Sequence, residues 1–420
     1  MNFRKLRWYL LFIGVLIITI ILRFSIVPKF SKTLSMDFHT FYSAGNLLVH
    51  GQNPYSPKLL DDYKRENIRH YYNPGDIPGT TPFWIWVNAF ASRLNLSCAS
   101  SSIIWFYLSM IFIVLGVWTI EQILAILAPH PTQNISKLVV LSAIFFLPIY
   151  GTLFVGQTSP LVFLLISMAL LGALRNHDHA ASICLAFAGA IKIFPAIGLL
   201  YLVVMRKWKS LFIGILFFIL IQLPVLFQRP KILKEFISSI FTYSGSSNVI
   251  KIGNQSLKAF LMRLTNTNSW SIHPIHGNAN LLYLLFILSL FSVTLWRALK
   301  FKEVGVHEKF ECIGTFILVG SICTPFLWHH SYIILLPFFI YLMYFNPKMG
   351  ALCFIMLQCQ HVYGPDSFPL SVAYYVPPLT SLALTSILII WGLFIFGKTL
   401  RFSHPLKSNL SSLLDVRHGG

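Results

Sequence analysis

Residues 102–127 read SIIWFYLSMIFIVLGVWTIEQILAIL and are almost entirely apolar. The run is longer than the roughly 20 apolar residues that a helix needs to cross a lipid bilayer. Backbone N–H and C=O groups have no water partner inside a bilayer, so such a run is expected to bond internally as an α-helix. This stretch therefore predicts a membrane-spanning helix, and with it an all-α polytopic membrane protein.

The composition of the whole chain agrees with a membrane protein. Of its 420 residues, 56% are hydrophobic and 11% are charged, a balance that soluble globular domains do not normally have. The 32 Lys and Arg against 13 Asp and Glu would also suit a nucleic-acid-binding protein. The basic residues, however, stand in short groups between apolar runs, so we interpret them as topology signals.

The six cysteines predict no covalent or metal framework. Most lie inside apolar runs, and they show neither the spacing of zinc ligands nor pairing between loops. The basic N-terminus followed by an apolar run resembles a signal peptide, but no small-residue cleavage pattern follows it. We therefore interpret that run as the first span.

The same length criterion predicts about twelve spans, some of them short helices shielded by their neighbours. They are 8–27, 102–127, 138–154, 160–174, 180–191, 194–205, 211–227, 281–299, 312–326, 332–345, 351–361 and 377–396.

Charge decides the ambiguous run 82–94, which Arg93 and Asn95 cut short. If this run is a surface helix, the basic clusters all fall on the side of the N-terminus, which the positive-inside rule makes cytoplasmic. This threading predicts one integral-membrane domain over 1–401 and a basic cytoplasmic tail over 402–420. Three segments then face the opposite side: outer loops at 28–101 and 228–280, and a shorter one at 361–376.

The first outer loop contains the stretch MDFHTFYSAGNLLVHGQNPY, residues 36–55. Its apolar side chains recur every three or four residues, which predicts an amphipathic helix on the membrane surface. Asp37 stands where a helix N-cap belongs, and Gly51 stands where a C-cap glycine belongs. Asp37 has two interpretations: it only caps the helix, or its carboxylate acts on a lipid-linked substrate at the water–lipid boundary.

Other polar side chains of separate segments are predicted on the same outer side. Lys192 lies in the turn between the short spans 180–191 and 194–205, where a buried ammonium requires an anion, although a lysine extending to the interface is the alternative. His329 and His330 precede a span and alternatively lie among lipid headgroups beside Trp328. The remaining candidates are His39, Gln157, Asn254 and Gln255.

Together these groups suit glycosyl transfer from a lipid phosphate, which needs a base for the acceptor hydroxyl and cationic or hydrogen-bonding groups for the phosphate. The sequence has no glycine-rich phosphate loop, no His-Glu-x-x-His helix and no Gly-x-Ser-x-Gly elbow. No inner loop is long enough to fold into a nucleotide-binding domain, so a lipid-linked donor is expected. Asp37 has no second acid beside it, so we predict no metal cofactor.

An ordered series of motifs resembles glycosyltransferase family 87, the polyprenol-phosphate-mannose-dependent mannosyltransferases of the C superfamily of integral-membrane glycosyltransferases. The series is Asp37-Phe38, Tyr42-Ser43-Ala44, Gly51-Gln52-Asn53-Pro54-Tyr55, Thr81-Pro82-Phe83, Gly156-Gln157, Lys192-Ile193-Phe194-Pro195, Arg206-Lys207-Trp208, Asn254-Gln255-Ser256-Leu257 and Thr324-Pro325-Phe326-Leu327-Trp328-His329-His330. The sequence departs from the family at Thr81-Pro82, where a Tyr-Pro-Pro type of segment is more usual, which leaves the acceptor open.

The resemblance implies the C-superfamily fold and inverting transfer of a hexose, mannose by likeness, from a polyprenyl-phosphate donor to a glycolipid or glycan acceptor. By the same likeness Asp37 is the general base, and Lys192 with His329 or His330 binds the donor phosphate. His39, Gln157, Asn254 and Gln255 are then substrate-binding candidates, and no cofactor is implied. A bacterial plasma membrane is the expected location, with the endoplasmic reticulum as alternative. A transporter or flippase and a structural assembly factor are the competing functions.

Overall fold

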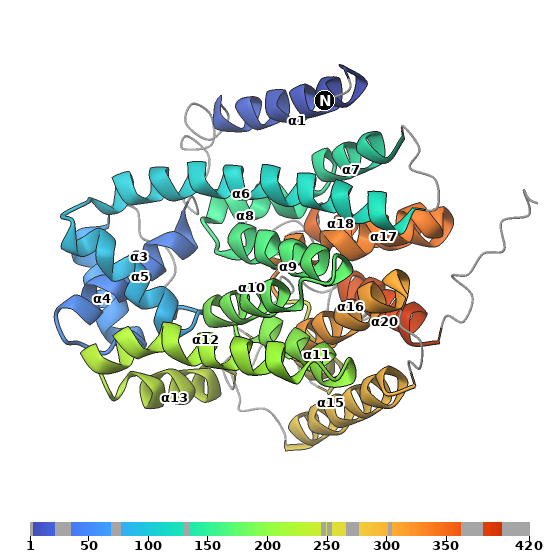
Figure 1. The fold of residues 1–420 in the computed structure, drawn as a ribbon. Coiled ribbons are helices and arrows are strands. Elements are labelled where there is room, and N and C mark those ends of the chain that lie inside the picture. Colours follow the sequence, from blue (N-terminus) through green and yellow to red (C-terminus); the bar gives the residue numbers. More distant parts are fainter. Residues whose placement is uncertain are drawn as a thin grey trace, which may run out of the picture.

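The computed structural model describes residues 3–21, 35–68, 77–128, 134–244, 249, 254–265, 277–300, 305–362 and 381–396. Within these ranges every regular element is a helix, and β-pairing is limited to an isolated bridge between Asn254 and Trp328. Figure 1 shows the helices stacked side by side with their axes mostly along one direction. The predicted all-α fold class is confirmed. The predicted tail 402–420 and most of the predicted loop 361–376 lie outside the described residues.

The first half of the chain forms the helices labelled α1 to α11 in Figure 1. They are α1 (Phe3–Ile21), α3 (Met36–Val49), α4 (Pro57–Asn67), α5 (Pro82–Arg93), α6 (Cys98–Leu127), α7 (Asn134–Ile144), α8 (Leu147–Val155), α9 (Ser159–Leu174), α10 (Asp178–Ile191), the 3-10 helix η2 (Phe194–Leu199) and α11 (Leu200–Val204). The second half adds α12 (Trp208–Gln228), α13 (Ile232–Ser244), α14 (Leu257–Thr265), α15 (Gly277–Ala298), α16 (Val306–Cys323), the 3-10 helix η4 (His329–Leu335), α17 (Leu336–Phe345), α18 (Pro347–Val362) and α20 (Leu382–Phe396).

Three described helices are long and apolar enough to cross a membrane by themselves: α6, α12 and α15. A fourth crossing is available from α7 and α8 together, which are bent by 49°. Pro148 at the start of α8 accounts for that break in the predicted span 138–154, because proline cannot continue a helix from the preceding turn. Six other predicted spans overlap shorter apolar helices: 8–27, 160–174, 180–191, 194–205, 332–345 and 377–396. The predicted spans 312–326 and 351–361 overlap α16 and α18, which do not meet the apolar criterion. The structure is consistent with a membrane protein and does not give the number of its spans.

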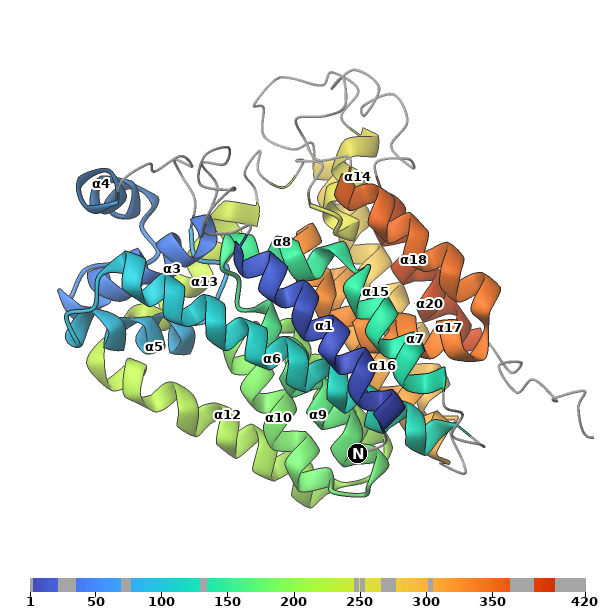
Figure 2. The same ribbon diagram turned by 90° about the horizontal axis from the view of Figure 1, so that it is seen from above.

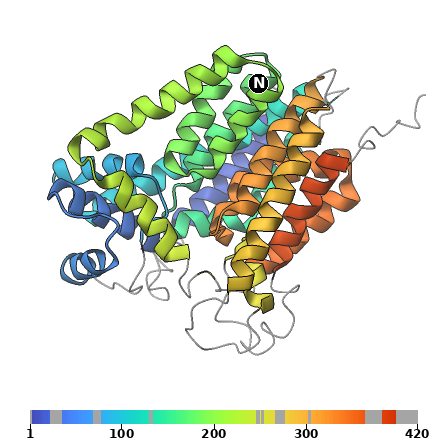
Figure 3. The same ribbon diagram turned by 90° about the horizontal axis from the view of Figure 1, so that it is seen from below.

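Burial separates central from peripheral helices. Half of the apolar window of α6 is buried, against 17% for α12 and for α15. Figure 3 shows α12 and α13 meeting in a V along one side of the molecule, with α15 on the neighbouring side. Large apolar residues such as Phe212 and Phe227 on α12 and Leu284 on α15 are exposed in the isolated chain. In a membrane protein such surfaces face lipid.

The helices of the two predicted outer loops gather at one end of the bundle. Seen from above in Figure 2, α3, α4, α13 and α14 lie toward the opposite end from the N-terminus, and α8 reaches the same end. α5 ends at Arg93, where the charges of the run predicted that it stops, and it is not among the helices that are long and apolar enough to cross a membrane by themselves. Its place on the membrane surface stays a prediction.

α3 differs from the predicted surface helix because it is buried on nearly all sides. It crosses α5 so closely that a Cβ added at Gly45 would lie 2.7 Å from the backbone of Asn88 and Ala89. The apolar spacing correctly predicted a helix, but the apolar side chains of α3 pack against other helices rather than lipid. The exposed amphipathic helix of this loop is α4.

The predicted capping role of Asp37 is also wrong. Ser35, with a left-handed φ of 58°, is the N-cap of α3, and Asp37 is the second residue of its first turn. The Ser35 N–H donates to the Phe154 carbonyl at 2.7 Å, which ties the start of α3 to α8, and the helix begins two residues earlier than its spacing suggests. Asp37 still faces the positive end of the helix dipole. At the other end, Gly51 has φ 68° as predicted, although the C-cap itself is His50.

Candidate active site

The candidate site is built around Asp37, whose position depends on a close contact between α3 and the end of α8. The C-cap of α8 is Gly156, which has a φ of +74° that side-chain-bearing residues rarely adopt. A Cβ there would lie 2.7 Å from the Cβ of Phe38, the residue after Asp37. Only glycine therefore brings the segment before α9 this close to the first turn of α3.

Gln157, immediately after that glycine, bonds directly to Asp37. Its side-chain Nε2 donates to Asp37 Oδ2 at 2.6 Å. Trp105 of α6 fixes the Gln157 backbone by donating its indole N–H to the carbonyl at 3.1 Å. The amide therefore holds the carboxylate in a defined orientation, and the sequence-predicted pair Asp37 and Gln157 comes together from residues 120 apart in the chain.

His330 approaches the same carboxylate oxygen. Its Nε2 lies 3.6 Å from Asp37 Oδ2, and both side chains are nearly buried. The imidazole lies parallel to the indole of Trp328, with ring centroids 6.4 Å apart. When protonated, His330 forms an ion pair with Asp37. His329 begins η4 beside it, and its side chain lies outside what the structure describes.

Lys192 brings a cation to the site from the end of α10. Its Nζ donates to Ser159 Oγ at 3.0 Å and to Ser331 Oγ at 3.1 Å. Burial lowers the pKa of Lys192 to about 8, and the negative charge of Asp37 opposes that shift. Two neutral hydroxyls hold the ammonium, and among the described residues Asp37 supplies the negative charge that acts on it.

Thr81 explains how that lysine is positioned. The Thr81 hydroxyl donates to the Ala190 carbonyl, and its backbone N–H donates to the Ile191 carbonyl at 3.2 Å. These are carbonyls of the last turn of α10, immediately before Lys192. Thr81 is also where the sequence departs from the family motif. At this position the side chain supports the end of α10, which carries Lys192.

Asn254 is hydrogen-bonded entirely to the backbone. Its Nδ2 donates to the Val249 and Pro325 carbonyls, and its Oδ1 accepts from the N–H groups of Leu327 and Ser256. Both donor hydrogens and both acceptor positions of the amide are engaged. Gln255 follows it, fully buried, with its backbone N–H on the Leu327 carbonyl at 2.9 Å. This loop therefore orders the segment that leads into Trp328 and His330.

His39 lies two residues beyond Asp37 on α3, which is about 200° around an α-helix. The two side chains consequently leave the helix on opposite faces. The structure brings Asp37, Gln157, His330 and Lys192 to one place, and it does not add His39 to them. Among the described residues, no group of three or more His, Cys, Asp or Glu side chains is arranged to hold a metal ion.

With this geometry in place, comparison with protein families gives a direct match. A model of glycosyltransferase family 87 matches residues 81–324, more than half of the chain. The chain belongs to glycosyltransferase family 87. No curated protein matches it.

Membership in family 87 makes this membrane protein a glycosyltransferase, with a sugar donor and an acceptor, rather than a transporter or a structural factor. The matched region includes Gln157, Lys192, Asn254 and Gln255. Asp37 and His39 precede it, and His329 and His330 follow it. The structure therefore joins residues inside the family match to residues on either side.

Three residues at the site were not predicted from the sequence. Ser159 and Ser331 bind Lys192, but isolated serines in apolar segments give no recognisable signal. Arg263 of α14 is also buried, and it donates to the Asn254 carbonyl at 3.0 Å and to Ser381 Oγ at 2.9 Å. A basic residue among the mostly apolar residues of 257–264 was the available signal for Arg263.

Proposed function

We propose that this family 87 protein transfers a hexose, mannose by family likeness, from a polyprenyl-phosphate donor to a glycolipid or glycan acceptor with inversion at the anomeric carbon. The observation that carries the proposal is the convergence of Asp37, Gln157, His330 and Lys192, from four separated segments, on one buried place. A carboxylate and a cation whose charges interact match what displacement of a lipid phosphate requires.

In the proposed reaction Asp37 accepts the proton of an acceptor hydroxyl as its oxygen attacks the anomeric carbon. The carbon–oxygen bond to the donor phosphate breaks, and that bond's electron pair leaves with the phosphate oxygen. The products are the glycoside, the polyprenyl phosphate and a proton held by Asp37, which then passes to water. Gln157 orients the carboxylate by its 2.6 Å hydrogen bond.

Lys192 is proposed to bind the phosphate as negative charge builds on it. The site is buried, so an ammonium stabilises a nearby anion more strongly there than in water. His330 contributes a second donor when protonated, and Asn254 with Gln255 positions the segment that carries it. We propose a metal-independent reaction on the outer face of a bacterial inner membrane, with both chain termini in the cytoplasm.

The proposal is tested with purified protein, labelled polyprenyl-phosphate mannose or glucose, and membrane glycolipid extract, with and without a chelator. We expect chelator-resistant mannose transfer by the native protein. Asp37→Asn keeps a similar shape but removes the base, so transfer should fall by at least about 100-fold while the melting temperature stays close to native.

The matched control is Asp62→Asn, which removes an exposed acid of α4 that contributes nothing to the site. It should transfer at the native rate. Unchanged turnover in Asp37→Asn would exclude the base assignment. Transfer of glucose but not mannose would exclude the proposed sugar, and loss of activity with chelator would exclude the metal-independent mechanism.

A further inference from the structure

A second candidate binding site lies at the other end of the bundle from Asp37. It is a cavity of about 680 Å³ between residues 176–180 and 206–210, which form the starts of α10 and α12 and the two residues before each helix. Lys192 follows the last residue of α10, whereas Asp178 in this cavity is its first residue. The length of that helix separates the two places, so the cavity is not part of the candidate active site.

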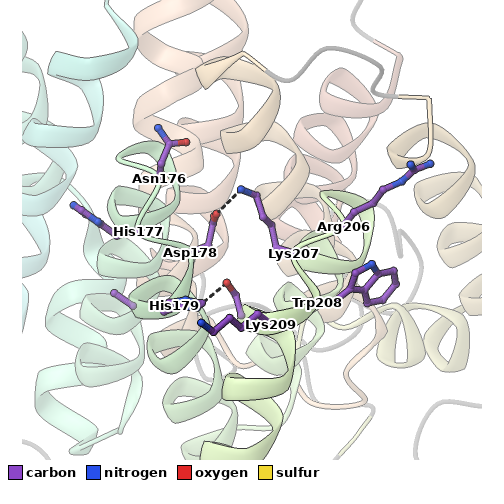
Figure 4. Close-up of a pocket in the computed structure, with 10 residues that line it drawn as sticks. Asn176, His177, Asp178, His179, Arg206, Lys207, Trp208 and Lys209 are labelled. Atoms are coloured by element: carbon purple, nitrogen blue, oxygen red, sulfur yellow. Dashed lines mark hydrogen bonds and ion pairs between the residues drawn. The ribbon is translucent and has the colours of Figure 1, made fainter.

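The cavity is strongly basic. Arg206, Lys207 and Lys209 line it against a single acid, Asp178. Lys207 forms an ion pair with Asp178 at 3.1 Å, and Figure 4 shows the lysine directed at that carboxylate while Arg206 points away from the pair. Neither Arg206 nor Lys209 makes a side-chain hydrogen bond or ion pair with any residue that the structure describes. Two cationic side chains therefore have charge available for an external anion.

The backbone adds to this positive potential. Lys207 is the N-cap of the 21-residue helix α12 and provides no side-chain cap for its first N–H groups. Ser210 of the first turn is engaged instead with His179 at 2.9 Å. Uncapped N–H groups and the helix dipole favour an anion at this end of α12, beside the two available cations.

An apolar surface begins at the same cavity. Trp208 lines the cavity and is 60% exposed, and it is followed along α12 by exposed Phe212, Ile215 and Ile219. Their spacing of four, three and four residues puts them on one face of the helix. A ligand that fits both parts has an anionic head in the cavity and an apolar chain along α12, which is the form of a membrane phospholipid.

Arg206 occupies a position that would ordinarily favour glycine. Its φ is 54°, and its N–H and that of Lys207 bond to the Val203 and Leu202 carbonyls, which is the left-handed ending of a helix. Glycine is the usual residue at such an ending because a side chain strains the backbone there. This strained position carries a guanidinium that has no partner among the described residues.

We propose that this cavity binds the headgroup of an anionic phospholipid, in the leaflet at the opposite end of the bundle from Asp37. The phosphodiester is held by Arg206, Lys209 and the first turn of α12, while an acyl chain lies along the Trp208 face. The site is independent of the transfer reaction and of the sugar donor.

The test compares phospholipid retention by the full-length protein in native mass spectrometry, after incubation with equal phosphatidylglycerol and phosphatidylcholine. The native protein should retain phosphatidylglycerol preferentially. Arg206→Gly with Lys209→Gln should reduce that retention at least fivefold without lowering the melting temperature, since glycine relieves the strained φ. The control Lys300→Gln with Lys348→Gln removes two other exposed basic residues and should retain phosphatidylglycerol as the native protein does.

Free glycerol phosphate at millimolar concentration distinguishes a phospholipid from a soluble anion. It should not displace the retained phosphatidylglycerol, because it lacks the acyl chain. Equal retention by the Arg206→Gly, Lys209→Gln variant and the native protein would overturn the proposal. Equal loss of retention in the control pair would also overturn it, because general surface charge would then explain the retention. Displacement by glycerol phosphate would overturn it by showing that the site binds a soluble anion.

Discussion

Lys192 titrates within an accessible pH range because burial lowers its pKa to about 8. An exposed lysine keeps its charge to about pH 10.4, but Lys192 loses its charge as pH rises through about 8. If Lys192 binds the donor phosphate, kcat/KM for the donor should fall by roughly tenfold for each pH unit above about 8. Steady-state kinetics from pH 6 to 9.5 measure this.

Lys192→Met should give a low kcat/KM with no such fall, and its melting temperature should not decrease. The folded-state pKa lies below the unfolded value, so the charged form costs stability below pH 8, and this cost disappears in the methionine variant. Lys58→Met changes an exposed lysine of α4 and should keep the native profile. A normal donor profile in Lys192→Met, together with reduced yield, would assign the residue a structural role.

Gly156 is predicted to control the geometry around Asp37. Gly156→Ala introduces both an unfavourable φ and a contact of 2.7 Å with Phe38, so α8 and α3 must separate. We expect a loss of about 1–3 kcal/mol in stability and at least a tenfold loss of transfer activity, because Gln157 moves away from the carboxylate. Thermal unfolding and a transfer assay measure the two effects.

Gly51→Ala is the matched control for that variant. Gly51 has nearly the same φ, +68°, but an added Cβ would meet nothing within 4 Å. It should therefore show the backbone strain without the loss of activity. Equal loss of transfer activity in both variants would contradict the prediction that the contact between residue 156 and Phe38 controls the site.

At the scale of elements, the crossing of α3 and α5 should be intolerant of any side chain at Gly45. A Cβ there meets backbone atoms of Asn88 and Ala89, which cannot rotate away as a side chain can. Gly45→Ala is expected to destabilise the protein by about 1–3 kcal/mol, measured by thermal unfolding in detergent. Gly14→Ala in α1 has open space and should be neutral or slightly stabilising. Equal melting temperatures for the two variants would contradict the close crossing.

For the molecule as a whole, the proposed orientation predicts which residues are reached from outside the cell. In a background with the native cysteines replaced, Asp62→Cys on α4 should react with a membrane-impermeant thiol reagent in intact cells. Lys348→Cys at the start of α18 should react only after the membrane is opened, because basic residues mark the cytoplasmic side. Reaction of both in intact cells, or of Lys348→Cys alone, would contradict the threading.

Apolar run length predicted much of the fold, since α6, α12 and α15 coincide closely with predicted spans. It could not predict the break between α7 and α8, because a proline within a long apolar run is compatible with either a kink or a stop. Apolar spacing wrongly predicted that α3 lies on the membrane surface. Spacing shows which face of a helix is buried, but not whether protein or lipid covers that face.

The candidate site was predicted in part. Asp37, Gln157, Lys192 and His330 carried signals because charged or amide groups are costly near a membrane. Ser159 and Ser331 carried none, because hydroxyl side chains are common in membrane helices and often bond locally. Thr81 stood out only as a departure from the family motif, which did not indicate its bond to the end of α10. Their roles follow from contacts between distant segments, which the sequence alone does not provide.

The two hydroxyls around Lys192 also bear on the end of the catalytic cycle. Its hydrogen-bond partners are neutral, and among the described residues Asp37 supplies the negative charge that acts on it, so the ammonium favours whichever ligand is more negative. In the proposed reaction the donor is a phosphodiester with one negative charge. The spent carrier is a phosphate monoester with about 1.5 to 2 negative charges at pH 7. The product should therefore bind more tightly than the substrate at this lysine. Turnover is then expected to be limited by departure of the carrier lipid, and added polyprenyl phosphate should inhibit.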